Sequence, residues 1–251
     1  MPELIIITVY NNNKLYENMK ETVFETKNNL SVEFIGLDNT QNKYSCAAKA
    51  YNDAIEEILN RKDTNKETNL IFCHQDLLFK GNTIEKLNEL CTKENNVLFG
   101  LAGVTDCKKY YDLPKKEIKF LTAINDLSYM KKGEIFDVFT LDELLVAGNI
   151  NIFSNLRFDE TVCDDWHLYV ADICLQCHLK GYGVKVFGGE ATHLSDGHTN
   201  KAYKRSEKRL ARKYNRVFPI INYTCGSAYT NPILFHMYRI YRKIKYEILG
   251  K

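Results

Sequence analysis

The sequence lacks an apolar run long enough to cross a membrane, and it lacks the marks of a secretory leader. A membrane-spanning helix needs about 20 consecutive apolar residues, and the 251-residue chain contains no such run. Residues 1–7 carry no basic segment and no small-residue cleavage site, so they favour a strand over a signal peptide. We therefore expect a cytoplasmic protein without a membrane span.

The cysteines lack the regular spacing of a disulfide scaffold. Eight of them are scattered along the chain, and a chain of this length buries enough surface to fold without disulfides. Residues 174–178 spell the C-x-x-C-H string of haem attachment, but the string lies in a helical pattern that places Cys174 and Cys177 in the core. We expect free thiols and neither haem nor zinc at this string.

A Gly-rich phosphate loop is also missing after the first apolar segment, where Asn11-Asn12-Asn13 stands instead. This absence counts against a sugar-1-phosphate nucleotidyltransferase, a class of enzyme that would need such a loop at this place. No internal repeat and no low-complexity segment occurs, and the length suits one α/β domain or one domain with an appendage.

Charge is present in both signs but is distributed unevenly. Residues 1–200 contain 21 Lys and Arg against 30 Asp and Glu, whereas residues 201–251 contain 13 against 2. Such asymmetry indicates an anionic partner, for which a membrane surface, a lipid diphosphate and nucleic acid are candidates. A solvated helical face would show the same pattern.

Apolar segments and helical patterns alternate along the chain. Short apolar segments at 4–10, 32–37, 69–73, 96–104 and 184–187 predict strands, and the spacing of apolar residues predicts helices at 46–59, 83–91 and 164–180. Gly181 stands where a glycine ends a helix. Alternating strands and helices are typical of an α/β fold with a mostly parallel central sheet flanked by helices. Residues 105–140 favour short strands and loops.

A polar triplet, His74-Gln75-Asp76, follows the apolar strand at 69–73. Ligands of open α/β sheets bind at the carboxyl ends of strands, and carboxylate oxygens bind Mg²⁺ or Mn²⁺ together with phosphates. The triplet therefore predicts a metal and diphosphate site. A turn aspartate and a hydrogen-bonded histidine of the partial core would produce the same pattern.

Several short motifs occur in a fixed order. They are Asp38-Asn39, Ala48-x-x-x-Asn52-x-Ala54, Phe72-x-His74-Gln75-Asp76, Phe158-Asp159-Glu160, Trp166-His167-x-Tyr169-x-x-Asp172-x-x-Leu175, Gly181-Tyr182-x-Val184 and His193-x-Ser195-x-Gly197. This set covers about residues 4–200 and resembles glycosyltransferases of the GT-A fold, family 2, in particular the streptomycin-biosynthesis-type branch.

The resemblance implies an inverting, metal-dependent transferase that uses a nucleotide sugar, with a UDP-sugar the first expectation. It implies a saccharide or lipid-linked saccharide acceptor in the synthesis of bacterial-type surface polysaccharide or glycoconjugate, and no nucleic-acid partner. Asp76 and His193 would hold Mn²⁺ or Mg²⁺. His74 departs from the family's usual carboxylate, so its role stays open between metal, sugar and phosphate. The nucleotide-sugar contacts would be Asp38, Asn39, Asn52, His74, Gln75 and Asp76.

A base is needed to deprotonate the acceptor hydroxyl. The helix predicted at 164–180 carries a polar stripe, which we expect to face the cleft and to place Asp172 there as the base, with His167 and Asp165 as alternatives. Asp165 could instead serve the helix dipole. Asp142, Glu143 and Trp166 are expected to contact the acceptor.

The C-terminal 51 residues form the predicted extension to a catalytic domain at 1–200, and we expect this extension to be basic and mostly helical. From about Pro232 an apolar stripe with basic neighbours predicts an amphipathic helix, formed by Ile233, Met237, Ile240, Tyr241, Ile244 and Ile248. The helix could rest on the inner face of the plasma membrane or pack on protein. Besides a transferase, we keep two alternative functions open: a sugar-nucleotide-binding protein without turnover and the nucleotidyltransferase.

Overall fold

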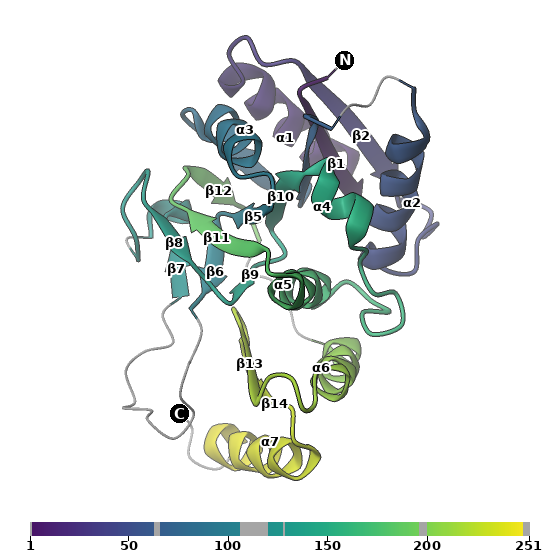
Figure 1. The fold of residues 1–251 in the computed structure, drawn as a ribbon, viewed down its shortest axis with the longest axis vertical. Coiled ribbons are helices and arrows are strands. Elements are labelled where there is room, and N and C mark those ends of the chain that lie inside the picture. The colour runs from purple at the N-terminus through teal and green to yellow at the C-terminus, as the bar shows by residue number, and fades with distance from the viewer. Residues whose placement is uncertain (1, 63–65, 106–119, 128, 196–199, 248–251) are drawn as a thin grey trace.

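A computed structural model of the chain describes residues 2–62, 66–105, 120–127, 129–195 and 200–247 (Figure 1). Its centre is a seven-stranded sheet with the spatial order β2-β1-β3-β10-β5-β11-β8. These strands are β1 (Leu4–Tyr10), β2 (Val32–Asp38), β3 (Asn69–Cys73), β5 (Val97–Gly100), β8 (Ile135–Asp137), β10 (Leu145–Asn149) and β11 (Gly183–Phe187).

Five of the seven strands run in one direction, and β10 and β8 run against them. The central sheet is therefore mixed, with the parallel majority that the alternating pattern predicts. The expected α/β class is confirmed.

Helices cover both faces of this sheet (Figure 1). Successive side chains of a strand point to opposite faces. In β1, Leu4 and Ile6 pack with α1 and α3, whereas Ile5 and Ile7 pack with α2, α4 and α5. These helices are α1 (Asn13–Thr26), α2 (Ala47–Asn60), α3 (Thr83–Lys93), α4 (Ile150–Asn155) and α5 (Tyr169–Lys180).

Three small sheets surround the central one. They consist of β4 (Leu77–Phe79) with β12 (Ala191–His193), of β6 (Ala102–Val104) between β7 (Phe120–Thr122) and β9 (Thr140–Leu141), and of β13 (Ile220–Tyr223) with β14 (Gly226–Tyr229). A short 3₁₀ helix, η2, spans Ile124–Asp126. The strand predicted at 96–104 thus divides at Leu101 into β5 and β6, which belong to different sheets. Residues 106–119, part of the segment expected to hold short strands and loops, lie outside the described residues.

Helix α5 begins later than the apolar spacing predicts. Leu168 adopts a left-handed backbone conformation with φ of 66°, so the helix starts at Tyr169 instead of residue 164. Its end is as expected, because Gly181 takes the left-handed conformation (φ 73°) of a glycine cap. Asp165, Trp166 and His167 therefore lie before the helix and not on its surface stripe.

The C-terminal segment packs on the rest of the molecule through α6 (Lys201–Lys213), the β13–β14 hairpin and α7 (Pro232–Glu247). This segment contributes to the core cluster that contains α2 and α5, through Tyr203, Leu210, Tyr214 and Ile221. The hairpin was not expected in a tail predicted to be mostly helical. The division at residue 200 stays a prediction, and α6 already shares the core of the preceding part.

The predictions of free thiols and of two core cysteines in the helix are confirmed for the residues that the structure describes. Cys174 and Cys177 are fully buried in α5, as expected of core residues, and the seven described cysteines are free thiols. Among the described helices, none combines the length and the apolar content that crossing a bilayer requires.

Candidate functional site

Two adjoining cavities open at the carboxyl ends of β1 and β3. One has a volume of about 320 Å³ and the other about 380 Å³, and Val9, His74 and Trp166 line both. The triplet 74–76 stands where they meet. The structure thus places the strand-end residues in a cleft of the size used for ligands.

Two strand pairings bring distant residues to this point. Strand β10 runs antiparallel to β3 with Leu145 opposite Cys73, so the segment before β10, Asp142-Glu143, lies beside the end of β3. Strand β12 pairs with β4 so that His193 stands opposite Leu77, and the Leu194 N–H donates to the Asp76 carbonyl at 3.1 Å. His193 is therefore held next to Asp76 by the register of a short ribbon.

His74, Asp76 and His193 form a cluster whose ligand atoms all lie within 4.8 Å of one another. The His193 Nε2 is 3.4 Å from the Asp76 Oδ1 and 3.4 Å from the His74 Nδ1, and the His74 Nδ1 is 4.0 Å from the Asp76 Oδ1. Two ligands at about 2.1 Å from an ion, at right angles, are about 3 Å apart. Small side-chain movements would therefore bring all three atoms onto one cation.

The electrostatics of the cluster favour a bound cation. Burial alone would raise the pKa of Asp76, but hydrogen bonds from His193 and Ser195 outweigh it and hold that pKa well below its usual value. Burial and the nearby His193 lower the pKa of His74. At neutral pH the cluster thus offers one carboxylate and neutral imidazole nitrogen, the donor set that Mn²⁺ and similar ions accept.

Gln75 fixes the loop that carries the cluster. Its side-chain oxygen accepts from the N–H groups of Asn11 and Asn12 at 3.0 and 2.9 Å, and its nitrogen donates to the Asn11 Oδ1 at 2.8 Å. These bonds tie the end of β3 to the end of β1. Asn11 and Gln75 both line the 320 Å³ cavity, and Asn11 is a lining residue that sequence reasoning missed.

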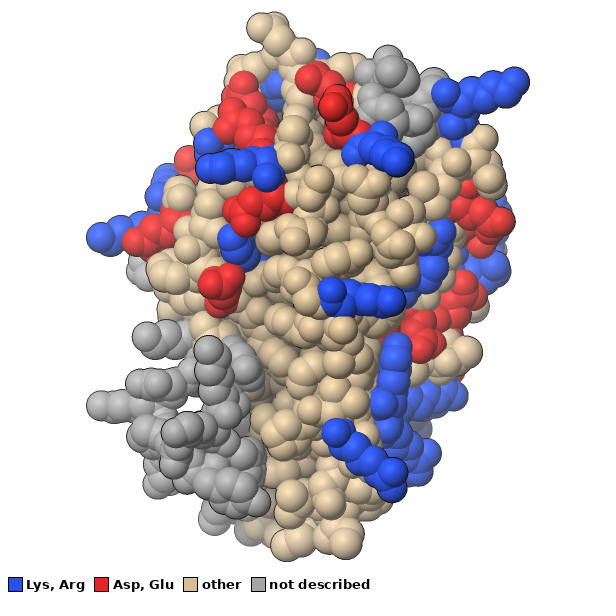
Figure 2. All heavy atoms as spheres, viewed as in Figure 1, with Lys and Arg blue, Asp and Glu red and all other residues tan. Residues whose placement is uncertain are grey.

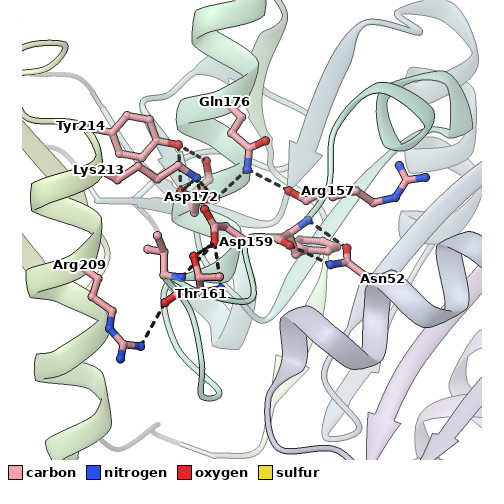
Figure 3. A network of polar contacts seen from close by, with 11 residues as sticks. Asn52, Arg157, Asp159, Thr161, Asp172, Gln176, Arg209, Lys213 and Tyr214 are labelled. Carbon is pink, nitrogen blue, oxygen red and sulfur yellow. Dashed lines mark hydrogen bonds and ion pairs between the residues drawn. The ribbon is translucent and has the colours of Figure 1, made fainter.

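The other residues expected at the nucleotide divide into two groups. Asn39 lines the 320 Å³ cavity, and its side chain accepts from the Tyr44 N–H at 2.7 Å. Asp38 is exposed, accepts from the Thr40 N–H and lines neither cavity. Asn52 lies beside the loop that contains Arg157 and Asp159 (Figure 3). Its amide donates to the Phe158 carbonyl and to the Glu160 carboxylate. Asn52 therefore links α2 to the loop that contains Phe158.

The 380 Å³ cavity contains the residues predicted to contact the acceptor. Asp142, Glu143 and Trp166 line it, together with His167. The Glu143 carboxylate accepts from the N–H of Leu168, the residue whose left-handed backbone precedes α5. Burial and the neighbouring Asp142 raise the pKa of Glu143 to about 8, while burial lowers the pKa of His167. Two titratable groups with shifted pKa values thus face one cavity, which is typical of acid–base sites.

The far wall of this cavity comes from the C-terminal segment. Tyr203 of α6 and Cys225, in the turn between β13 and β14, line it beside Tyr169 of α5. Tyr169 belongs to the stripe that was expected to face the cleft, and it does line this cavity. Sequence reasoning missed Tyr203 and Cys225, since only tertiary packing brings them to the cleft.

Neither cavity has a lysine or arginine among the described residues that line it. A nucleotide diphosphate carries several negative charges, which need compensation in a partly buried site. In the described part of the chain, the cluster of His74, Asp76 and His193 is where a cation could supply that compensation.

Asp172, our first expectation for the base, does not line either cavity. Its fully buried carboxylate accepts from the Lys213 Nζ at 2.7 Å, the Tyr214 hydroxyl at 2.9 Å and the Gln176 amide at 2.7 Å (Figure 3). At Asp172 the polar stripe of α5 therefore faces α6, and Gln176 donates to the Arg157 carbonyl at 2.9 Å. Neither residue lines a cavity. Asp165 lines neither cavity, and its carboxylate accepts from Asn200 at 3.5 Å.

Lys213 joins Asp172 to Asp159, whose carboxylate it reaches at 2.8 Å. Burial would raise the pKa of Asp159, but hydrogen bonding from Lys213 outweighs it and lowers this pKa to about 2. The Asp159 carboxylate also accepts from the N–H groups of Thr161 and Val162. These bonds stabilise the loop that contains the F-D-E motif. The network clamps this loop between α5 and α6.

Replacing Lys213 with methionine is expected to lower the free energy of unfolding by about 3 kcal/mol, because it leaves the buried Asp172 without its cation. Urea unfolding followed by circular dichroism measures the change. Lys204→Met, at an exposed position of the same helix, is the matched control and should change it by about 0.5 kcal/mol or less. Equal effects of the two substitutions would contradict the structural role of the network.

The fold has parallels among solved structures. A crystal structure of GalNAc-T7 with UDP, GalNAc and Mn²⁺ matches 84% of this chain at 10% identity with a TM-score of 0.57. The chain spans about half of that protein, 47% of its length. A crystal structure of A197 from STIV matches 78% of this chain and 87% of its own at 12% identity, with a TM-score of 0.48. No curated protein sequence matches the chain.

The resemblance to GalNAc-T7 supports the GT-A type of fold, and at this identity it supports the fold alone. A family match carries the assignment further. The sequence model described as "Glycosyltransferase like family" matches residues 5–216, which is most of the chain. The match includes the cluster, α6 and the described residues that line the two cavities, except Cys225. This protein therefore belongs to that glycosyltransferase family.

Proposed function

We propose that this protein transfers a sugar from a nucleotide-diphosphate sugar, a UDP-sugar in the first instance, to the hydroxyl of a saccharide or lipid-linked saccharide. The observation that supports this most is the cation cluster placed between two cavities that have no lysine or arginine among their described lining residues. The family match and the UDP, GalNAc and Mn²⁺ in the GalNAc-T7 structure agree with it.

In this proposal the two cavities take the two substrates. The 320 Å³ cavity would hold the donor, with Asn39, His74, Gln75 and Asp76 as contacts, and the 380 Å³ cavity would hold the acceptor against Asp142 and Trp166. Since Asp38 and Asn52 line neither cavity, we no longer propose them as nucleotide contacts. Trp166 borders both cavities and would lie where the reacting sugars meet.

His74, Asp76 and His193 would hold the cation, and the mixed nitrogen and oxygen set favours Mn²⁺ over Mg²⁺. When bound, the cation would neutralise the leaving diphosphate. Gln75 would keep the donor side of the cluster in place through its bonds to Asn11 and Asn12.

We move the proposed base from Asp172 to Glu143, which lines the acceptor cavity. The ionised Glu143 carboxylate would take the proton of the acceptor hydroxyl, while that oxygen bonds to the anomeric carbon and the bond from this carbon to the diphosphate breaks. Attack from the face opposite the leaving group inverts the anomeric centre, in line with the family 2 resemblance. His167, which lines the same cavity, is the second candidate.

The class of acceptor determines the biosynthetic pathway and the cellular compartment in which the transfer takes place. We propose synthesis of a bacterial-type surface polysaccharide or glycoconjugate, carried out in the cytoplasm. Assignment to the streptomycin-biosynthesis-type branch stays a proposal as well, supported by the ordered motifs of residues 38–197.

The test is a screen of common nucleotide sugars for nucleotide release, with and without Mn²⁺ and with a panel of saccharide acceptors. We expect release that depends on Mn²⁺ for at least one donor and that rises when the right acceptor is present. Donor binding without release across the panel would favour the binding-protein alternative. Formation of a nucleotide sugar from a sugar-1-phosphate and UTP would favour the nucleotidyltransferase.

A further inference from the structure

Helix α7 presents its large apolar side chains to solvent. Ile233, Met237 and Ile240 are 71%, 62% and 60% exposed, and Leu234, Tyr241 and Ile244 are exposed as well. At 3.6 residues per turn, these six side chains fall within about one third of the helix circumference. The helix therefore has one continuous apolar face that the described part of the protein does not cover.

The opposite side of α7 is the one that packs on the protein. Phe235 is buried in the main core cluster, and the ring of Tyr238 lies 5.0 Å from that of Tyr229 in β14. Arg242 reaches Glu207 of α6 at 4.0 Å. In a helix that serves only its own core, the apolar face would point inward. Here the core takes Phe235 and leaves the broader apolar face outside.

The segment that carries this face is strongly basic. Lys243 stands beyond one edge of it, roughly 60° around the helix from Ile240. Helix α6 beside it carries seven Lys and Arg, and two of them, Lys208 and Arg212, lie next to His236 of α7. Residues 201–251 contain only two acids, Glu207 and Glu247, and Glu207 is buried and accepts from the Tyr223 hydroxyl. In Figure 2 the blue side chains gather at the lower right, where α6 lies in Figure 1, and tan side chains prevail at the bottom, where α7 lies.

We propose that α7 docks the protein on an anionic lipid bilayer. The apolar face enters the boundary between headgroups and acyl chains, and Lys208 and Arg212 of α6, with Lys243 of α7, meet the negative headgroups beside it. A basic helix with exposed Ile, Leu, Met and Tyr on one side has the composition of such interfacial helices.

A second copy of the chain fits this face less well. A stripe on a 16-residue helix is about 24 Å long and about 10 Å wide, which gives each partner far less than the roughly 800 Å² of a stable interface. Pairing two stripes would also bring the basic edges of both copies together. Lipid headgroups would instead neutralise these charges.

Docking through α7 would bring the acceptor side of the cleft close to the lipid. Cys225, at the turn of the β13–β14 hairpin, lines the 380 Å³ cavity, and α7 packs on β14 of this hairpin. This consequence, unlike the docking itself, rests on the proposed function, and it selects a lipid-linked acceptor among the acceptor classes.

The test is co-sedimentation of the full chain with phosphatidylcholine vesicles that contain or lack phosphatidylglycerol. We expect binding to the anionic vesicles that weakens with added salt. The double substitution Met237→Glu with Ile240→Glu should weaken it at least about tenfold, and Lys208→Gln with Arg212→Gln should also weaken it. The matched control Leu179→Glu, at an equally exposed position of α5, should bind as the unmodified protein does.

Absence of binding to anionic vesicles would overturn the proposal, as would equal binding by the Met237→Glu, Ile240→Glu protein. A dimer in solution that this double substitution dissociates would assign the face to a second copy instead. Nucleotide release with a water-soluble acceptor should be the same in all these variants, because none of them lies at the cleft. A failure of the transferase assay would thus leave the vesicle result standing.

Discussion

Asp76→Ala is expected to lower kcat/KM for sugar transfer by at least about a thousandfold, which corresponds to about 4 kcal/mol of transition-state stabilisation. Asp76 is the only carboxylate of the cluster, and its depressed pKa keeps it ionised at neutral pH. With alanine, two histidines stay close to the leaving diphosphate but no anionic ligand holds the cation. Initial rates of nucleotide release at saturating Mn²⁺ measure the loss.

A matched control separates loss of the ligand from loss of charge. Asp53→Ala removes a carboxylate on the outer side of α2, where it pairs with Lys49 at 3.2 Å, and should leave the rate within about twofold. Circular dichroism should show that both variants are folded. Full metal-dependent activity in Asp76→Ala would contradict the site assignment even if the protein proves to be a transferase.

Glu143→Gln is expected to lower kcat by about a hundredfold to ten-thousandfold, the range of general base catalysis, with little change in the KM of the donor. Glutamine can still accept from the Leu168 N–H, so the local structure should persist. Asp142→Asn is the neighbouring control. We expect it to raise the KM of the acceptor more than it lowers kcat, because Asp142 lines the acceptor cavity and accepts from Thr224.

The pH dependence distinguishes the two candidate bases. With Glu143 as the base, kcat/KM should rise about tenfold per pH unit up to about pH 8 and then level off, because the active form is the ionised carboxylate and its pKa is about 8. With His167 as the base, the rise should end below pH 6.5, because burial lowers the pKa of that imidazole. If kcat/KM of the Glu143→Gln variant still rises with pH and levels off near pH 8, Glu143 is excluded as the base.

The same pKa shift has a consequence for stability. The folded pKa of Glu143 lies above its ordinary value of 4.5, so its contribution to stability is fully present below pH 4.5 and is lost as the pH rises through about 8. Glu143→Gln removes this loss. The variant should therefore unfold at a higher temperature than the unmodified protein at pH 9.

The elements that the sequence predicts best are those whose signal is local. The apolar runs at 4–10 and 69–73 became β1 and β3, and Gly181 ends α5 as expected. The position of His74-Gln75-Asp76 followed from the same local pattern, since a polar triplet after a buried strand stands at the carboxyl edge of the sheet.

The features that escaped prediction depend on distant contacts. Leu168 adopts a left-handed backbone conformation, which delays the start of α5. Leucine rarely adopts this conformation, so the residue type does not predict it. Asp172, on the helical stripe expected to face the cleft, instead contacts Lys213, which is 41 residues further along the chain. His193 was predicted through the family resemblance, and only the β4–β12 register explains how it reaches Asp76.

Calorimetric titration of UDP, with and without Mn²⁺, tests the central claim most directly. If His74, Asp76 and His193 hold the cation that binds the diphosphate, UDP should bind the unmodified protein only when Mn²⁺ is present. Folded Asp76→Ala and His193→Ala proteins should not bind it under either condition. UDP binding of equal strength without metal, or unchanged Mn²⁺-dependent binding in both variants, would contradict the account.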